Sequence, residues 1–155
     1  MDVRPLREGD RARTRAWLRE HWQESMAAHG ELFFPAEHEG FVAGDWEGLL
    51  TYRIGGGRCE VTLLKAIRDG EGIGSALLEA TVGAARDAGC RDIWLITTND
   101  NLRALAWYER KGFTVAEVRA GAVDEARATL KPSIPTHNTE TGLPISDEIE
   151  LSLAP

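Results

Sequence analysis

A glycine-rich turn that runs straight into an apolar helix pattern places the tightest limit on how this chain can fold. The turn lies within RDGEGIGSALL, residues 68–78. Glycine occupies alternate positions in it: Gly70, Gly72 and Gly74. The continuous apolar run at 58–67 before the turn predicts a central β-strand. Apolar residues recur at helical spacing over 72–88, and Gly89 is well placed to end that helix. A strand, a turn and a helix are therefore predicted in direct succession.

The remaining segments alternate between strand and helix patterns. Further strands are predicted at 2–6, 41–43, 48–54, 92–98, 113–118 and 148–153, and further helices at 11–22, 101–111 and 122–130. Residues 27–40 have the breakers of a loop, and 131–146 forms a long loop with three prolines. This order of elements predicts an α/β domain with a mixed sheet.

Length, composition and charge exclude several classes of protein. A chain of 155 residues has the size of one domain, so a single domain is expected over 1–155. No stretch approaches the roughly 18 to 20 apolar residues of a membrane span, and the charged start has no secretion signal, so no membrane partner and a cytoplasmic location are expected. The net charge of −7, without a long basic run, counts against nucleic acid as a partner.

The potential metal ligands do not have the spacing of a metal site. Two cysteines, Cys59 and Cys90, are expected to be reduced. Four histidines stand outside any zinc-binding motif: His21, His29, His38 and His137. We expect no metal, and the histidines are interpreted as surface or loop residues.

The glycine turn has both a structural and a functional interpretation. Glycines leave the backbone open to a phosphate group, and the following helix directs its free N–H groups and its positive dipole end at the same place. A turn of this kind can equally be structural. Two common nucleotide-binding motifs do not fit this turn. A P-loop has a Lys-Ser/Thr pair after its last glycine, and no such pair follows Gly74. A Rossmann fingerprint has Gly or Ala at the position where this chain has Leu77.

Two stretches carry recognisable motifs: GEGIGSALLEA and ITTNDNLRALAWYERKGF. Together they resemble the GNAT superfamily of N-acetyltransferases, and the resemblance covers about residues 41–118. The second motif, Asn-x-x-Ala-x-x-x-Tyr closed by Gly-Phe, is complete: Asn101, Ala104, Tyr108, Gly112 and Phe113. In the first motif, Arg/Gln-x-x-Gly-x-Gly/Ala, Gly72 and Gly74 fit. Asp69 occupies the Arg/Gln position, and Arg68 stands one residue early.

The resemblance implies a fold and a cosubstrate. The fold is a mixed, mostly antiparallel sheet of about six to seven strands flanked by helices, with a central β-α-β-α-β core that binds acetyl-CoA. The backbone of the glycine loop would bind the pyrophosphate, while Asp69 and Glu71 would point to solvent. The cofactor-binding residues implied are Leu64 and Ala66 for the pantetheine arm, Gly70, Gly72, Gly74 and Ser75 for the pyrophosphate, and Asn101. Asn101 could equally be a plain helix cap.

The resemblance also implies catalytic roles for Tyr108 and Glu60. The matching tyrosine of the family protonates the leaving thiolate. Asn101 and Tyr108 lie seven residues apart, so they project from one face of their helix. Glu60 is the candidate base, and strand alternation predicts that it shares a face with Thr62, Leu64 and Ala66. The alternatives are that Tyr108 packs with a polar tip at the surface and that Glu60 is a solvated edge residue.

The expected activity is acetyl transfer from acetyl-CoA to a primary amine of a small molecule or peptide, by direct attack in a ternary complex. The alternative is a GNAT-like module that binds acyl-CoA and regulates without useful catalysis. Asp69 favours this alternative, and the intact Tyr108 argues against it. The segment 131–146 is long for a connection, so it is interpreted as a lid or a dimer contact, which leaves a homodimer open.

Overall fold

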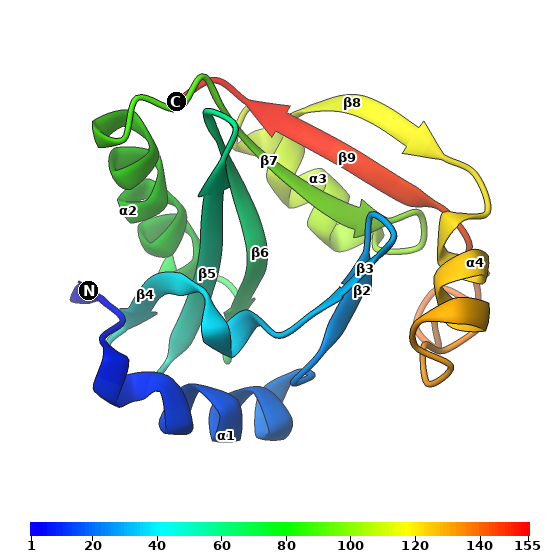
Figure 1. Cartoon of the computed structure of the whole chain (residues 1–155), viewed down its shortest axis with the longest axis horizontal. Helices are drawn as coiled ribbons and strands as arrows, with labels where there is room; N and C mark the ends of the chain where they lie inside the picture. Colours follow the sequence, from blue (N-terminus) through cyan, green and yellow to red (C-terminus); the bar gives the residue numbers. More distant parts are fainter. The chain divides into compact units, whose positions relative to one another are not determined.

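Antiparallel strand pairs form most of the structure in this computed structural model, which describes residues 1–155 (Figure 1). The chain divides into two units. The first unit contains residues 1–25, 34–93 and 154–155, and the second contains 26–33 and 94–153.

The first unit contains four of the strands. They pair in the order β1-β4-β5-β6, and each is antiparallel to the next. The strands are β1 (Val3–Pro5), β4 (Glu39–Ala43), β5 (Gly48–Gly55) and β6 (Arg58–Ala66). The helices are α1 (Arg11–His21), α2 (Ile73–Asp87) and the short 3-10 turns η1 (Glu8–Asp10) and η2 (Pro35–Glu37).

The helix that follows the glycine turn, α2, packs against β4, β5 and β6 through its apolar stripe. Ile73 and Leu77 of this stripe are at most 1% exposed. Burying such side chains stabilises the fold by about 1.5 to 3 kcal/mol each. At Gly48 of β5 an added Cβ atom would lie 2.4 Å from Ile73 Cγ2 of the helix. The helix can therefore pack this closely over residue 48 because that residue has no side chain.

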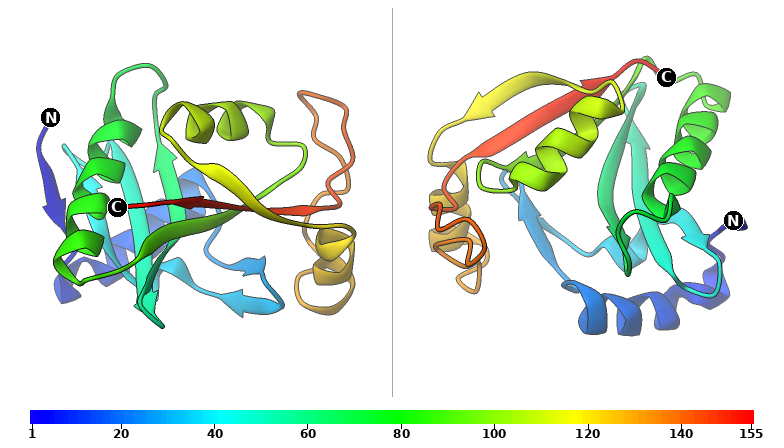
Figure 2. Two further views of the ribbon diagram at one scale, coloured as in Figure 1. Left: turned by 90° about the horizontal axis from the view of Figure 1, so that it is seen from above. Right: turned by 180° about the vertical axis from the view of Figure 1, so that it is seen from behind.

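The second unit contains the remaining strands and helices. Its strands are β2 (Met26–Ala28), β3 (Glu31–Phe33), β8 (Thr114–Arg119), β9 (Glu148–Leu153) and β7 (Asp92–Thr98), which begins in the first unit. Its helices are α3 (Leu102–Arg110) and α4 (Ala122–Thr129). β9 lies between β7 and β8, and β8 and β9 are antiparallel. Figure 2 shows α3 and α4 at different places along these strands.

A hairpin occupies part of the segment that the sequence predicts to be a loop. β2 and β3 pair through a two-residue turn, and the chain then forms η2 and enters β4 at Glu39. The loop prediction for 27–40 is therefore wrong. Each strand is only three residues long, too short to show an alternating pattern, and the turn has His29-Gly30 instead of the usual Asn-Gly.

The other predicted elements agree with the structure to within a few residues, and the α/β class with mostly antiparallel pairing is confirmed. None of the helices combines the length and apolar character needed to cross a membrane. The interpretation of 1–155 as one domain stays a prediction.

The long segment 131–146 is held by side chains on its neighbours. Arg127 donates hydrogen bonds to the carbonyl oxygens of Ile134, Pro135 and Ile145, at 2.7 to 2.9 Å. Asn99 accepts from the main-chain N–H groups of Ser146 and Asp147, both at 3.0 Å. Three carbonyls of this segment therefore accept charge-assisted hydrogen bonds from one guanidinium. Its role as a lid or dimer contact stays a prediction.

The close approach at Gly48 generates a prediction about stability. We expect Gly48→Ala to lower the free energy of unfolding by about 1 to 3 kcal/mol, because the added methyl group must displace α2. The matched control is Gly83→Ala within α2, where a Cβ would meet nothing within 4 Å. That change should raise the free energy of unfolding by up to about 1 kcal/mol. Urea denaturation measures both, and equal effects would contradict the packing described.

Candidate active site

The glycine turn adopts a backbone conformation that favours glycine. Gly70 and Gly72 have φ angles of +77° and +76°, in the left-handed region, and Gly72 is the N-cap residue of α2. A Cβ atom at either position would meet nothing within 4 Å. Conformation, not crowding within the protein, therefore explains these glycines, and the backbone here is open to a ligand.

The first turn of α2 presents main-chain donors that the protein does not use. The first intrahelical bond runs from Ala76 N–H to the Gly72 carbonyl at 3.0 Å. The N–H groups of Ile73, Gly74 and Ser75 have no acceptor within the protein. Together with the positive end of the helix dipole, they form a site suited to an anion such as a phosphate.

The acidic side chains near this turn are partly neutralised by Arg68. Its guanidinium donates to the carboxylates of Glu71 and Glu47. The hydrogen bond that Arg68 donates to Glu71, followed by the one it donates to Glu47, raises the pKa of Arg68. Glu71 is half exposed, which is compatible with a carboxylate directed to solvent, and it also forms an ion pair with Arg68 three residues earlier.

A bulge in β6 changes which residues share a face of the strand. Thr51 pairs with Leu63 whereas Tyr52 pairs with Val61, so Thr62 is an extra residue without a partner opposite. Because side chains alternate with a period of two, one extra residue reverses the faces beyond it. Residues 64 and 66 therefore lie on the opposite face from Glu60, and the prediction that Glu60 shares a face with Leu64 and Ala66 is wrong.

Glu60 is buried and forms an ion pair across the β5–β6 ladder. Its side chain is 9% exposed, and Oε1 accepts a hydrogen bond from Arg53 Nε at 2.8 Å. The interpretation of Glu60 as a solvated edge residue is therefore wrong. Oε2 has no hydrogen-bond partner within the protein, so one oxygen could still accept a proton. The role of Glu60 as a base stays a prediction.

The bulge residue Thr62 connects to a histidine that sequence reasoning missed. Thr62 Oγ1 lies 2.7 Å from Thr51 Oγ1 and 2.9 Å from His38 Nδ1, both at hydrogen-bond distance. His38 is thus part of a polar chain on the strand and not a plain surface residue. No motif marks it, since the contact between His38 and Thr62 arises only in the folded sheet, between residues 24 positions apart in the chain.

The family motif on α3 lies in the second unit. Asn101 occupies the N-cap position as predicted, but its side chain donates to Thr97 Oγ1 at 3.3 Å and does not cap the helix. Tyr108 stacks edge to face with Trp107 and Phe113, at ring distances of 5.1 and 5.3 Å. Its hydroxyl has no hydrogen-bond partner within the protein. Burial raises the pKa of Tyr108, so the phenol keeps its proton at neutral pH.

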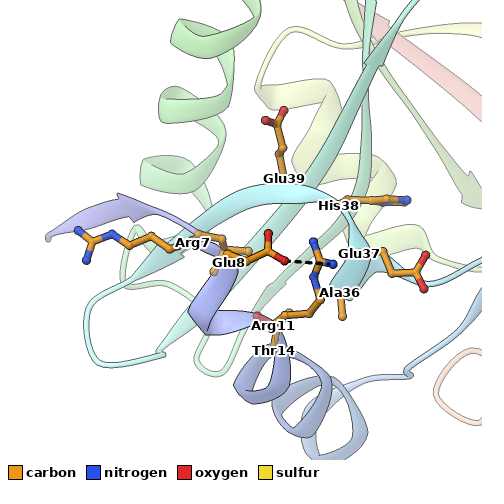
Figure 3. Close-up of a pocket in the computed structure, with 9 residues that line it drawn as sticks. Arg7, Glu8, Arg11, Thr14, Ala36, Glu37, His38 and Glu39 are labelled. Atoms are coloured by element: carbon orange, nitrogen blue, oxygen red, sulfur yellow. Dashed lines mark ion pairs between the residues drawn. The ribbon is translucent and has the colours of Figure 1, made fainter.

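A separate crevice of about 200 Å³ lies in the first unit, beside η1, α1 and η2. Figure 3 shows that its charged side chains diverge: Arg7, Glu37 and Glu39 point in different directions. Glu8 and Arg11 form an ion pair with each other, at 3.6 Å. This crevice has no convergent set of reactive groups. No cluster of three or more His, Cys, Asp or Glu side chains is arranged to hold a metal ion.

Comparisons with known proteins agree with the motifs. The family model described as the acetyltransferase (GNAT) family matches residues 3–113. The chain is 42% identical over 137 residues to the uncharacterized protein YdhI of Bacillus subtilis (strain 168), covering 85% of this chain and 84% of YdhI.

Two solved structures have a similar fold. An acetyltransferase of Bacillus subtilis in complex with CoA is 15% identical, with a TM-score of 0.68, over 99% of this chain and 97% of that chain. The ribosomal-protein-S18-alanine N-acetyltransferase of Escherichia coli is 16% identical, with a TM-score of 0.65, over 99% and 92%. These likenesses confirm the predicted GNAT-like fold.

The environments of the two tyrosines predict an unusual titration. Burial raises the pKa of both Tyr108 and Tyr52, with a further contribution from Glu39 at Tyr52. The folded protein should therefore form tyrosinate at a higher pH than the urea-unfolded chain, which titrates near pH 10. The corresponding stability should be complete below about pH 10 and be lost as pH rises through the folded-state pKa values. Absorbance at about 295 nm measures this; coincident folded and unfolded curves would contradict it.

Proposed function

The chain belongs to the acetyltransferase (GNAT) family, and from this premise we propose that it transfers an acetyl group from acetyl-CoA to a primary amine of a small molecule or peptide. The observation that carries the proposal is the open glycine turn with three unused N–H groups at the start of α2. A pyrophosphate is an anion that such donors bind well.

The binding of acetyl-CoA would use mainly backbone groups of the first unit. The pyrophosphate would accept hydrogen bonds from the N–H groups of the turn and of the first helical turn, at Gly70, Gly72, Ile73, Gly74 and Ser75. The pantetheine arm would pair with the β6 backbone at Leu64 and Ala66. The B. subtilis structure with CoA supports this choice of ligand. Asn101, whose side-chain oxygen has no partner within the protein, is proposed as a further contact to CoA.

The chemical step would be direct attack in a ternary complex. The amine nitrogen forms a bond to the thioester carbonyl carbon, and the carbon–sulfur bond breaks. Glu60 would take the proton that the amine loses, directly or through water, and Tyr108 would give a proton to the departing thiolate. Because burial raises the pKa of Tyr108, the hydroxyl is protonated at neutral pH and has a proton to donate.

A second candidate function is the binding of acyl-CoA for regulation, without useful catalysis. It is favoured by Asp69 at the position where the family pattern has Arg or Gln. Tyr108 argues against it, since a protonated hydroxyl without a partner has no evident use in a module that only binds. Acetyl transfer remains the function that the residues support best.

The experiment that tests the function is a turnover screen. The purified protein is incubated with acetyl-CoA and a panel of primary amines, with release of free thiol and the mass of the acetylated amine as readouts. We expect at least one amine to be acetylated. CoA binding without acetylation of any amine in a broad panel would favour the regulatory alternative.

Removal of the Tyr108 hydroxyl should slow the chemical step. We expect Tyr108→Phe to lower kcat by roughly 10- to 1000-fold, the usual scale for a general acid, while the Kd for CoA changes little. The matched control is Tyr52→Phe, which removes the other hydroxyl of the same kind. Unchanged turnover in Tyr108→Phe, with chemistry shown to limit the rate, would remove this residue from the mechanism.

Replacement of Glu60 should change the pH dependence of the reaction. If Glu60 takes the amine proton, Glu60→Gln should flatten the low-pH limb of the kcat/KM profile, because the variant has no carboxylate to protonate. The control is Glu79→Gln, which makes the same charge change at an exposed position on α2. A Glu60→Gln profile with the parent's shape would assign the base role to another group.

Distortion of the glycine turn should remove the cosubstrate site. We expect Gly72→Val to weaken CoA binding by more than about tenfold, since a β-branched residue strongly resists the left-handed conformation of residue 72. Gly83→Val adds the same side chain farther along α2 and should leave the Kd for CoA within about twofold. Calorimetric titration measures both; equal affinities would refute the backbone site.

A further inference from the structure

The connection between β4 and β5, residues 44–47, contains a strained residue. Trp46 has a φ of +56°, in the left-handed region that bulky side chains avoid. It is 7% exposed, and its carbonyl oxygen accepts a hydrogen bond from Trp17 Nε1 on α1 at 2.9 Å. Residues in such conformations persist where the surrounding structure fixes them, and they are concentrated at functional sites. The packing of Trp46 therefore fixes the direction in which the chain continues into Glu47.

Glu47 binds the start of the glycine turn at two points. Its main-chain carbonyl oxygen accepts a hydrogen bond from the N–H of Ile67 at 3.0 Å. Its carboxylate Oε2 accepts a hydrogen bond from Arg68 Nη2. The other carboxylate oxygen occupies space beside Gly44, where an added Cβ atom would lie 2.5 Å from Oε1. Residue 44 leaves room for the carboxylate because it has no side chain, and the connection thus directs a carboxylate toward Arg68.

The Arg68 guanidinium lies beside the proposed anion site. Its Nε donates to Glu71, the residue directly before Gly72, which is the N-cap of α2. Its Nη1 group has no partner within the protein. The Arg68 side chain is 49% exposed, so water reaches both of its ion pairs, and exposed pairs of this kind are weak. The guanidinium can therefore exchange a partner at little cost.

A phosphate bound at the start of α2 offers the guanidinium a better partner than Glu47 does. Phosphate oxygens bind a guanidinium through two parallel charge-assisted bonds, whereas Glu47 binds it through one oxygen. A guanidinium that moves toward α2 keeps Glu71 within reach, because Glu71 belongs to the same turn. The same movement separates it from Glu47, which is 21 positions away in the chain. Glu47 is therefore the partner that a phosphate would replace.

We propose that Glu47 is a positioning residue of the cosubstrate site: it binds the Arg68 guanidinium in the unliganded protein, and a phosphate group of acetyl-CoA takes its place when the cosubstrate binds. This inference rests on the proposed function and adds a competition to it. Glu47 competes for the guanidinium and not for the main-chain N–H groups of 73–75. Its carboxylate therefore lowers the affinity for acetyl-CoA and for the product CoA, and it favours release of the product.

The test is a calorimetric titration of the full chain with CoA at about 0.15 M salt. We expect Glu47→Gln to lower the Kd by about 3- to 5-fold, the range that one exposed ion pair supplies. The variant keeps the main-chain bond to Ile67, so it should fold normally by near-UV circular dichroism. A purely structural role would give the opposite sign, since a loosened turn binds more weakly. A Kd equal to the parent's or higher would overturn the proposal.

The matched control is Glu79→Gln, which makes the same charge change at an exposed position on α2. It should leave the Kd for CoA within about 1.5-fold, because salt screens an exposed charge that is farther from the site. A gain in affinity as large as that of Glu47→Gln would show an effect of net charge alone and would overturn the proposal.

A double variant separates exchange from simple repulsion. Arg68→Gln should raise the Kd roughly 5- to 50-fold, since the phosphate loses its charge-assisted bonds. When Glu47→Gln is added to Arg68→Gln, the Kd should change by less than about twofold, because no guanidinium is left to compete for and salt screens the remaining repulsion. The same gain from Glu47→Gln with and without Arg68 would mean that Glu47 only repels the ligand, which would overturn the proposal.

Two smaller ligands identify the phosphate involved. Pantetheine has no phosphate, so its affinity should be the same for the parent and Glu47→Gln, and a gain for pantetheine would overturn the proposal. Dephospho-CoA lacks the 3′-phosphate: a gain that persists assigns the exchange to the pyrophosphate, and a gain that disappears assigns it to the 3′-phosphate. A parent that binds no CoA would contradict the proposed function as well, whereas a parent that binds CoA and acetylates an amine without any effect of Glu47→Gln would contradict this inference alone.

Discussion

The antiparallel pairing of β5 with β6, interrupted by one extra residue, determines how the first unit presents its polar groups. Along the ladder each residue of β6 faces a partner on β5, until Thr62 enters without one. Since side chains alternate strictly, this insertion places Glu60 on one face and Leu64 on the other. The same pairing brings Glu60 to Arg53, and the extra residue brings its hydroxyl to Thr51 and His38.

The glycine turn after β6 shows how an acidic loop can still receive an anion. The donors are main-chain N–H groups at the start of α2, and their direction is fixed by the helix and by the left-handed conformation of Gly72. The nearby carboxylates of Glu47 and Glu71 do not compete directly, because Arg68 binds both. Several charge-assisted bonds of about 1.5 to 3 kcal/mol each outweigh repulsion of about 1 kcal/mol from an exposed charge near 4 Å in water.

The sequence predicted those parts of the structure that rest on local patterns. The helical spacing after Gly72, the strand at 92–98 and the complete motif from Asn101 to Phe113 each identified an element that the structure contains. The β2–β3 hairpin was missed because three-residue strands have no readable period. The bulge at Thr62 was missed because a continuous apolar run looks the same with or without an unpaired residue.

The side-chain environments depended on contacts far apart in the chain. Arg53 reaches Glu60 only after the β5–β6 turn, and Glu148 meets His29 across 119 residues. Neither contact has a local signature in the sequence. The family motif and the strand position therefore predicted roles for Glu60 and Tyr108, whereas only the structure shows the ion pair at Glu60 and the raised pKa of Tyr108.

The most direct test of the backbone site is an NMR titration of the full chain with CoA. We expect the amide signals of Ile73, Gly74 and Ser75 to move progressively and reach saturation, because their N–H groups acquire acceptors. The exposed residues Glu109 and Glu140 provide reference signals that should stay in place. Saturable CoA binding that leaves the amides of 73–75 unmoved would contradict the central claim that this backbone holds the pyrophosphate.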